Sequence, residues 1–291
     1  MKSPNGNSPP REWAWRWMRI GKLRWQVNGD FADAKFLARL AAPAGLMSPP
    51  ARLIRPRTGS GTTEVAWVTL SALPDTPLIV KRYHSRNMWQ QLRGLFRTPR
   101  AQRAFELAFR LQANGISTAV PVAAVDSRSP WQKSAFLITM EVRSAFRLYE
   151  FNQACQDARK RRAVIKALAR LMAALHDLEL SHADPSLTNF LVLRTPENAW
   201  RLVLIDLDGL RANRLLSRRG ELKDLRRLSK RAVAEPHERL VFLTAYCRAR
   251  QPPLVAREIA RRIGPLPPVV RYDVTPSSAP LDTPAALLSD D

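Results

Sequence analysis

One short loop between apolar segments constrains this chain more than any other feature. The string HADPSLTNFLV at 182–192 places Asp184 two residues after His182, and Asn189 stands directly before an apolar strand. A loop this short can present a carboxylate and an amide oxygen to the same point. The alternative is a solvated Asp-Pro turn in which Asn189 serves as a helix cap.

A second carboxylate, Asp206, ends the next apolar strand in the string LVLIDLDGL at 202–210. Phosphoryl transfer needs a carboxylate to orient the attacking hydroxyl and accept its proton, a role we expect for Asp184. Hard Mg²⁺ prefers oxygen ligands, so Asn189 and Asp206 are the expected metal ligands. Asp208 should point to the same side of an extended backbone as Asp206 and either assists the metal or faces solvent.

A lysine follows an earlier apolar run, LIV at 78–80. Lys81 is placed to reach the α- and β-phosphates of a nucleotide, and such a lysine needs a carboxylate to hold it. Glu106 is the only acidic residue of the helix expected at 100–114, which makes it the natural partner. The alternative for Glu106 is a surface ion pair with Arg110 on the next helical turn.

Two glycines, Gly59 and Gly61, precede the strand that begins near Val65. Glycines let backbone N–H groups approach phosphates closely, so both are expected to bind nucleotide. A Gly-Ser-Gly string alone also suits an ordinary hairpin turn. Its position ahead of Lys81 is what favours the nucleotide interpretation.

The order of these motifs is the order found in protein-kinase-like enzymes. We therefore predict an α+β fold of two lobes, a small β-rich N-terminal lobe and a mainly helical C-terminal lobe. Hydrophobic periodicity and turn residues predict strands within 51–83 with a turn at Pro74 and Asp75, a strand at 134–142, strands at 190–193 and 202–205, and helices at 100–114, 157–179, 221–234 and 236–250.

Several strings extend this resemblance to one family: VKRYH at 80–84, RAFELAFRLQANGISTAVPVA at 103–123, FLITMEV at 136–142, LIDLD at 204–208 and KDLRRLSKRA at 223–232. Over roughly residues 50–250 the chain resembles the lipopolysaccharide kinases that phosphorylate Kdo or heptose. The resemblance implies ATP and Mg²⁺ as cofactors and a sugar hydroxyl of the lipopolysaccharide inner core as acceptor. It also implies that Met140 and Val142 lie in a hinge that contacts adenine through backbone groups.

The chain departs from protein kinases around the catalytic loop. Ala183 replaces the arginine that commonly engages a phosphorylated activation loop, and Leu207 and Asp208 replace the Phe and Gly after the metal-binding aspartate. These changes favour a glycolipid or small-molecule acceptor over a protein. We expect Asp224 to accept hydrogen bonds from the catalytic-loop backbone, or else to be a carboxylate at a helix N-terminus.

Two further histidines, His182 and His176, are expected to be structural rather than catalytic. His182 is placed to support the catalytic loop. His176 stands at the end of an apolar helix, where a histidine more often has a structural role. Neither is expected to act as an acid or base.

Charge favours an anionic partner. Lys and Arg number 47 against 25 Asp and Glu, a net charge of +22, which attracts phosphorylated sugars or an anionic membrane surface. Solvated basic helix faces are the alternative. No nucleic-acid-binding motif is present, so nucleic acid is not an expected partner. The competing hypotheses are a kinase for another small molecule or protein, and a basic membrane- or nucleic-acid-binding protein with a kinase-like shell.

The expected organisation is a partly disordered leader at 1–25, a kinase-like domain at 26–263 divided into lobes at 26–142 and 143–263, and a flexible Pro-rich tail at 264–291. Trp13, Trp15 and Trp17 recur at every second position in the segment 11–25, which also contains several Arg and Lys residues. That pattern suits either a membrane interface or a strand packed through one Trp face. Without a signal segment or a long apolar run, we expect a cytoplasmic protein. The resemblance to the lipopolysaccharide kinases implies a peripheral position on the cytoplasmic face of the inner membrane.

Overall fold

The computed structural model describes residues 15–20, 23–32, 43–48, 50–55, 63–70, 73–84, 98–127, 134–182, 185–212, 218–231 and 235–264. These residues form two compact units. The first contains the described residues up to Glu141 except 116–118, and the second contains 116–118 and the residues from Val142 onward. The leader before residue 15, Gly59, Gly61, Asp184 and the tail after Gly264 lie outside the described residues.

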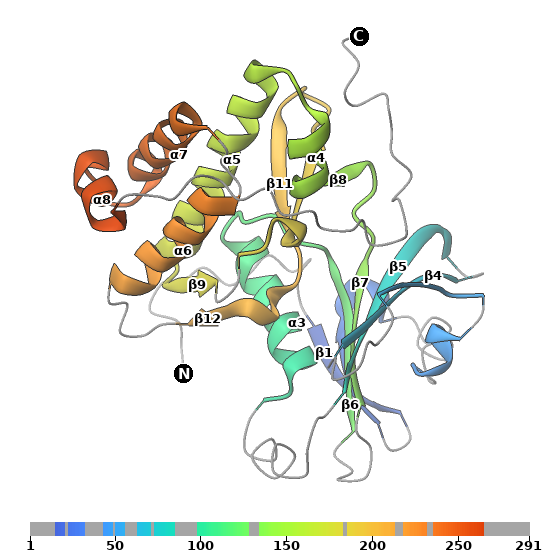
Figure 1. Ribbon diagram of the computed structural model, residues 1–291. Helices are drawn as coiled ribbons and strands as arrows, with labels where there is room; N and C mark the ends of the chain where they lie inside the picture. Colours follow the sequence, from blue (N-terminus) through green and yellow to red (C-terminus); the bar gives the residue numbers. More distant parts are fainter. Residues whose placement is uncertain are drawn as a thin grey trace. The chain divides into compact units, whose positions relative to one another are not determined.

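The first unit is built on a seven-stranded antiparallel sheet with strand order β1-β2-β6-β7-β5-β4-β3 (Figure 1). Its strands are β1 (Trp15–Ile20), β2 (Leu23–Asn28), β3 (Arg52–Arg55), β4 (Thr63–Leu70), β5 (Leu73–His84), β6 (Pro121–Ser127) and β7 (Ser134–Met140). Short 3-10 turns lie at η2 (Gly29–Phe31) and η3 (Gly45–Met47). Alternating apolar residues give the sheet one core face, which includes the fully buried Trp25, Val80 and Ile138.

Helix α3 (Arg100–Ala113) packs on β6 and β7 in this unit (Figure 1). Its buried residues recur at helical spacing and include Ala101, Phe105, Ala108 and Leu111. Gly115 ends the helix in a left-handed conformation, with φ of 73°, where glycine has no Cβ to clash. Its N–H bonds the carbonyl of Gln112 at 2.9 Å. The helix predicted at 100–114 is therefore confirmed almost to the residue.

Two expectations about this unit need correction or extension. Pro74 and Asp75 lie inside β5 rather than in a turn, because Leu70 of β4 already pairs with Leu73. Proline is tolerated near the first residues of a strand, where a missing N–H costs least. The leader boundary expected at residue 25 falls inside β2, which pairs with both β1 and β6.

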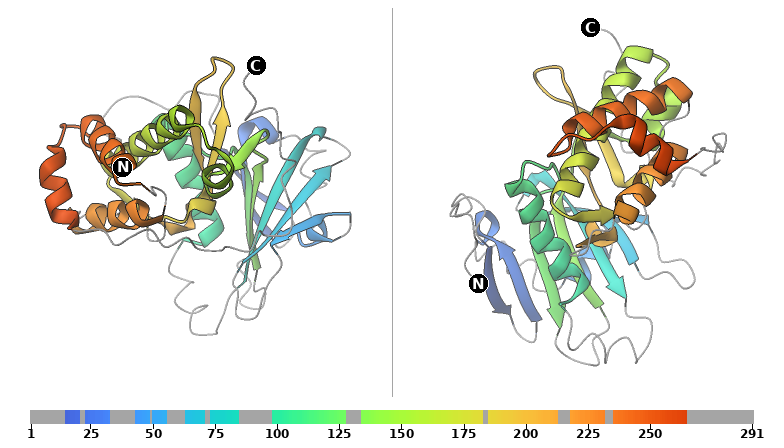
Figure 2. Two further views of the ribbon diagram at one scale, coloured as in Figure 1. Left: turned by 45° about the horizontal axis from the view of Figure 1, so that its top comes forward. Right: turned by 90° about the vertical axis from the view of Figure 1, so that its left-hand side faces the viewer.

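The second unit is mainly helical, with α4 (Leu148–Ala154), α5 (Ala158–Asp177), α6 (Arg218–Arg231), α7 (Pro236–Ala249) and α8 (Ala256–Ile263). Helices α5 and α7 pack side by side (Figure 2), and α8 contacts both α6 and α7. Asp157 begins α5, since its carboxylate accepts the N–H groups of Arg159 and Lys160 at 2.6 and 3.1 Å. These two hydrogen bonds also lower the pKa of Asp157.

Two small sheets complete the second unit, in the orders β11-β10-β8 and β12-β9. Their strands are β8 (Ala145–Arg147), β9 (Leu180–His182), β10 (Phe190–Arg194), β11 (Trp200–Leu204) and β12 (Leu210–Ala212), with 3-10 turns η4 (Leu187–Asn189) and η5 (Leu207–Gly209). Helix α5 packs on β11. None of the helices in the described ranges combines the length and the apolarity needed to cross a bilayer.

Candidate active site

Asn189 and Asp206 lie at the same end of the β10–β11 hairpin. The two strands are antiparallel with Phe190 opposite Leu204, so Asn189 precedes one strand where Asp206 follows the other. The N–H of Ile205 donates to the carbonyl of Asn189 at 2.9 Å, which extends the ladder to the two site residues. The hairpin thus brings the backbone positions of Asn189 and Asp206 to the same end of the sheet.

The end of β11 is fixed by a second segment of the same unit. The Leu204 N–H donates to the Ser117 carbonyl at 2.9 Å, and the Thr118 hydroxyl donates to the Leu204 carbonyl at 2.7 Å. The backbone N–H and carbonyl groups of Leu204, two positions before Asp206, are therefore both hydrogen-bonded to this segment. A metal ligand benefits from such a rigid base, because its position then does not depend on a free loop.

Asp206 itself adopts a left-handed backbone conformation, with φ of 59° and ψ of 64°. Non-glycine residues rarely adopt this conformation, although aspartate tolerates it better than most, and such residues cluster at functional sites. The chain then turns through η5, so the backbone at Asp206 to Asp208 is not extended. The extended backbone expected between Asp206 and Asp208 is therefore wrong.

The loop predicted to be catalytic follows a segment that is anchored at His182. Strand β9 pairs with β12, with His182 opposite Leu210. The carboxylate of Asp224 in α6 accepts the backbone N–H of His182 at 2.6 Å. Asp224 lies in the middle of α6, not at its N-terminus, so the alternative role as a helix-terminal carboxylate is wrong. The expected bond to the catalytic-loop backbone is confirmed at His182.

The ring of His182 meets the segment that follows Asp206. A Cβ added at Gly209 would lie 2.6 Å from Cε1 of His182 and 3.1 Å from Nδ1. Non-bonded carbon atoms do not approach this closely, so residue 209 must be glycine for the ring to stay in place. This glycine was not predicted from the sequence, where its signal is its position directly after the LIDLD string.

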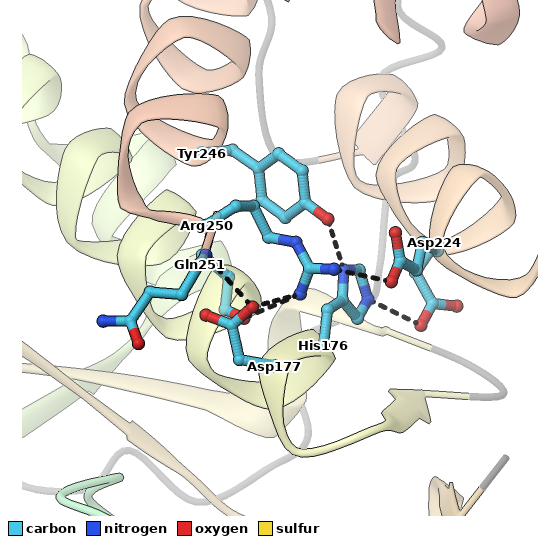
Figure 3. A network of polar contacts seen from close by, with 8 residues as sticks. His176, Asp177, Asp224, Tyr246, Arg250 and Gln251 are labelled. Atoms are coloured by element: carbon cyan, nitrogen blue, oxygen red, sulfur yellow. Dashed lines mark hydrogen bonds and ion pairs between the residues drawn. The ribbon is translucent and has the colours of Figure 1, made fainter. Parts of the chain in front are cut away.

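Asp224 also belongs to a buried network of polar contacts with α5 and α7 (Figure 3). His176 in α5 places Nε2 3.5 Å from an oxygen of Asp224 and Nδ1 2.8 Å from the hydroxyl of Tyr246 in α7. A carboxylate can only accept, which assigns the proton to Nε2; in the neutral ring Nδ1 then accepts from Tyr246. Burial raises the pKa of Tyr246 far above its ordinary range, so the hydroxyl keeps its proton.

Arg250 follows the last residue of α7 and links this end of the helix to α5 and α6 (Figure 3). Its guanidinium donates to Asp177 at 2.6 Å and to Glu221 at 2.9 Å. Asp177 ends α5, and Glu221 lies one turn before Asp224 in α6. The structural role expected for His176 is therefore confirmed, and Tyr246 and Arg250 join it. Sequence reasoning missed both, because neither has a local pattern that distinguishes it from a surface residue.

Lys81 lies in the middle of the large sheet of the first unit, between Val65 of β4 and Leu137 of β7. Residues two apart on a strand face the same side, so Lys81 and Tyr83 share a face. The guanidinium of Arg100, the first residue of α3, lies 4.9 Å from the centre of the Tyr83 ring. Lys81 therefore lies on the face of the sheet that α3 covers, as a lysine held by a residue of α3 requires.

Glu106 lies on that helix and accepts a hydrogen bond from the Gln26 amide at 3.1 Å. Gln26 is on β2, three strands away from Lys81 in the sheet. Glu106 thus contacts the sheet through Gln26. The ion pair between Lys81 and Glu106 stays a prediction.

The predicted hinge begins at the end of β7. The N–H of Met140 donates to Val120 at 2.9 Å, and that of Glu141 donates to Pro77 at 3.0 Å. Both hydrogen bonds fix the end of β7 to neighbouring segments of the first unit. They use the N–H groups of Met140 and Glu141, and the next N–H group along the chain is that of Val142. Contact of Met140 and Val142 with adenine stays a prediction.

The sequence profile of the lipopolysaccharide kinase (Kdo/WaaP) family matches residues 62–247. The chain belongs to this family. It is therefore a kinase, and the hypothesis of a binding protein with a kinase-like shell is set aside. The matched segment of this lipopolysaccharide kinase includes Lys81, Glu106, Asn189, Asp206 and Asp224.

A solved structure described as WaaP in complex with acyl carrier protein has a similar fold. The TM-score is 0.52 at 22% sequence identity, and the match covers 72% of this chain and 81% of that one. Among curated protein sequences, none matches this lipopolysaccharide kinase. Strands β1 and β2 and residues Gly59, Gly61 and Arg250 fall outside the segment that defines the family.

Proposed function

We propose that this lipopolysaccharide kinase transfers the γ-phosphoryl group of ATP to a sugar hydroxyl, of Kdo or heptose, in the lipopolysaccharide inner core. The observation that supports it most is the pairing of Asn189 and Asp206 at one end of the β10–β11 hairpin. The anchored catalytic loop at His182 adds to this. We also propose that the two compact units, which divide after Glu141, correspond to the two lobes of a protein-kinase-like fold.

The residues present fit Mg²⁺. Asn189 and Asp206 offer neutral and anionic oxygens from neighbouring chain segments, and such oxygens are what this hard cation prefers. The left-handed backbone at Asp206 is the strain expected where function dictates a side-chain direction. Bound Mg²⁺ supplies neutralisation of the charge on the ATP phosphates.

Nucleotide binding involves the first unit. Lys81 binds the α- and β-phosphates, and Glu106 orients Lys81. The backbone of Gly59 and Gly61 covers the phosphates. Placement of Lys81 on the face of the sheet covered by α3 supports the first two roles.

Adenine contacts the backbone of the hinge at Met140 and Val142. The bonds of Met140 and Glu141 to Val120 and Pro77 make that segment rigid, which suits recognition of a planar base.

Asp184 performs the proton transfer. Its carboxylate aligns the acceptor hydroxyl and accepts its proton as the hydroxyl oxygen bonds to the γ-phosphorus. The bond between that phosphorus and the β–γ bridging oxygen breaks, and ADP leaves with the electron pair. The bond from His182 to Asp224 sets where this loop starts, two residues before Asp184.

Charge supports an anionic acceptor. Basic residues dominate at 81–110, with eight against one acid, and at 211–231, with nine against two. Core sugars that carry carboxylates and phosphates would be attracted to such surfaces. A kinase for another small molecule or for a protein is the alternative. The departures at Ala183, Leu207 and Asp208 count against a protein acceptor.

Two further proposals concern place and partner. A glycolipid acceptor puts the kinase in the cytoplasm at the surface of the inner membrane. The similar WaaP structure was solved in complex with acyl carrier protein. A protein of that kind is therefore a candidate partner of this chain.

The test uses purified protein, Mg²⁺-ATP and a panel of deacylated lipopolysaccharide cores. Wild-type protein should phosphorylate one of these cores, and Asp184→Asn should lower turnover by about a thousandfold while ATP binding changes little. Mass spectrometry of the product then identifies the sugar and hydroxyl. Equal loss of turnover and ATP binding in Asp184→Asn would remove Asp184 from the role of base, and transfer only to non-core acceptors would refute the proposed substrate.

A further inference from the structure

Strand β1 forms one edge of the large sheet and precedes the segment that defines the family. Trp15, Trp17 and Arg19 alternate on one face of β1, where they lie opposite Asn28, Gln26 and Arg24 of β2. We call Trp15, Trp17, Arg19 and Arg24 the tryptophan face. Gln26 bonds Glu106, which shows that this face is on the same side of the sheet as α3.

Both indole rings on this face are fixed yet exposed. Trp15 packs against Phe105 and Phe109 of α3, with ring centres 6.3 and 5.2 Å apart. The Arg24 guanidinium lies 3.7 Å from the centre of the Trp17 ring. Trp15 nevertheless remains 38% exposed and Trp17 44% exposed. Rings held in this way lose little conformational entropy when they bind something.

The charge around these rings is positive. Strands β1 and β2 contain Arg16, Arg19 and Arg24 and no acidic residue. Asp126 of β6 lies opposite Arg24, and Glu106 of α3 accepts a hydrogen bond from Gln26. Arginines of α3, including Arg103 and Arg110, are exposed on the helix that supports Trp15. Cations therefore outnumber acids on this part of the first unit.

Protection of an edge strand does not explain this composition. Charged side chains alone keep an exposed edge strand from pairing with another chain, whereas two exposed tryptophans make such an edge more prone to associate with other molecules. Trp with neighbouring Arg is the composition found at the interface between membrane and water, where an indole ring sits at the level of the headgroups. The cations add attraction to anionic lipids.

We propose that the tryptophan face docks this kinase on an anionic phospholipid bilayer. The docking inserts Trp17 and the edge of Trp15 among the headgroups, and Arg19 and Arg24 contact lipid phosphates. The inference deepens the proposed function, because an acceptor glycolipid would be reached from the same membrane surface. It assigns a role to two strands that the family match does not include.

The test is cosedimentation of the full chain with vesicles of phosphatidylethanolamine and phosphatidylglycerol at 3:1, compared with neutral phosphatidylcholine vesicles. Wild-type protein should bind the anionic vesicles and bind the neutral ones much more weakly. The double variant Trp17→Ala/Arg19→Glu should bind the anionic vesicles about tenfold more weakly. Equal binding of wild-type protein to both kinds of vesicle would overturn the proposal.

The opposite edge of the same sheet provides a matched control. Leu53 of β3 is 50% exposed and lies near Arg55. The variant Leu53→Ala/Arg55→Glu makes the same change in charge and also removes an exposed apolar side chain. It should bind anionic vesicles within about twofold of wild type. If both double variants weaken binding equally, overall charge and not the tryptophan face is responsible, and the proposal fails.

A conservative variant tests the proposal even if the double variant does not fold. Trp17→Phe keeps an aromatic ring but removes one fluorophore. Quenching of tryptophan fluorescence by vesicles that contain brominated lipid should be clearly smaller in Trp17→Phe than in wild type. Identical quenching would show that Trp17 does not enter the headgroup region and would overturn the proposal.

Two more measurements separate this idea from its alternatives. Phosphate transfer to a water-soluble deacylated core should be the same in wild type and Trp17→Ala/Arg19→Glu. The vesicle assay does not use this acceptor, so its result tests the docking proposal even if the proposed acceptor is wrong. Binding to acyl carrier protein should also be unchanged. Loss of that binding together with intact vesicle binding would assign the face to a protein partner and overturn the proposal.

Discussion

Asp224 and His182 are joined by a 2.6 Å hydrogen bond from the backbone N–H of His182 to the Asp224 carboxylate. Both residues are almost fully buried. A buried bond to a charged acceptor is among the stronger single contacts in a protein. It therefore fixes the backbone two residues before Asp184, the proposed base, more firmly than the short β9–β12 pairing alone.

Asp224→Asn should weaken this anchor while it keeps the shape of the side chain. An amide is a weaker acceptor than a carboxylate, so we expect the free energy of unfolding to fall by about 2 kcal/mol. The turnover number should fall at least tenfold, with the KM for ATP within about twofold. Urea unfolding and steady-state kinetics measure these effects.

Asp157→Asn is the control for that substitution. Asp157 also accepts two backbone N–H groups, but it is exposed at the start of α5, where asparagine caps as well as aspartate. Its stability and turnover should stay near wild type. If the two variants behave alike, the buried anchor has no special role.

Tyr246→Phe should destabilise the protein through His176. The lost hydroxyl leaves the acceptor Nδ1 of a buried imidazole without the hydrogen bond it has at 2.8 Å. We expect a loss of about 1–3 kcal/mol in the free energy of unfolding. Tyr149→Phe is the control, because the Tyr149 hydroxyl meets Gln153 at an exposed position. Equal effects of the two substitutions would contradict the proposed direction of the network.

Gly209→Ala should affect catalysis more than stability. Its methyl group would lie 2.6 Å from the His182 ring, so the ring and the catalytic loop must shift. Gly115→Ala provides a contrast: a Cβ there meets nothing within 4 Å, and the cost of about 1 kcal/mol comes from its positive φ. Turnover should fall at least tenfold in Gly209→Ala and stay within twofold in Gly115→Ala. The opposite ranking would refute the close packing.

Glu238→Gln should change how stability depends on pH. Burial by itself raises the pKa of Glu238, but hydrogen bonds and charge from Arg161 outweigh burial and lower the pKa below its ordinary 4.5. A carboxyl with a lowered pKa stabilises the folded state above its ordinary pKa, and that contribution is lost as pH falls through the folded value. The bonds to Arg161 measure 2.8 and 3.1 Å.

Wild type should therefore be more stable than Glu238→Gln by about 2 kcal/mol at pH 7. The difference should shrink as pH falls from 7 through the lowered pKa of Glu238. Glutamine keeps the shape of the side chain and the capping role at the start of α7. Thermal unfolding followed by circular dichroism across this pH range gives the two curves; parallel curves would show that Arg161 does not stabilise the charged form.

Local patterns explain which parts of the fold were predicted well. Helix α3 and helix α5 agree with prediction within one or two residues, because apolar spacing, a capping aspartate and a left-handed glycine all act over a single turn or two. Strands β7, β10 and β11 follow from apolar runs bordered by turn residues. Helices α4 and α8 were not predicted, because they are short and their apolar repeats span barely two turns.

By itself the sequence determined the family and the order of the chemical groups, since motif spacing does not depend on how the chain packs. The tertiary structure alone decided which groups meet. Tyr246 and His176 are 70 positions apart, and Asp224 and His182 are 42 apart. Only packing of α5, α6 and α7 brings such residues within hydrogen-bond distance. Likewise, only strand pairing showed that Trp15 and Trp17 stand on the edge of the sheet, because exposure is a property of the fold and not of a local pattern.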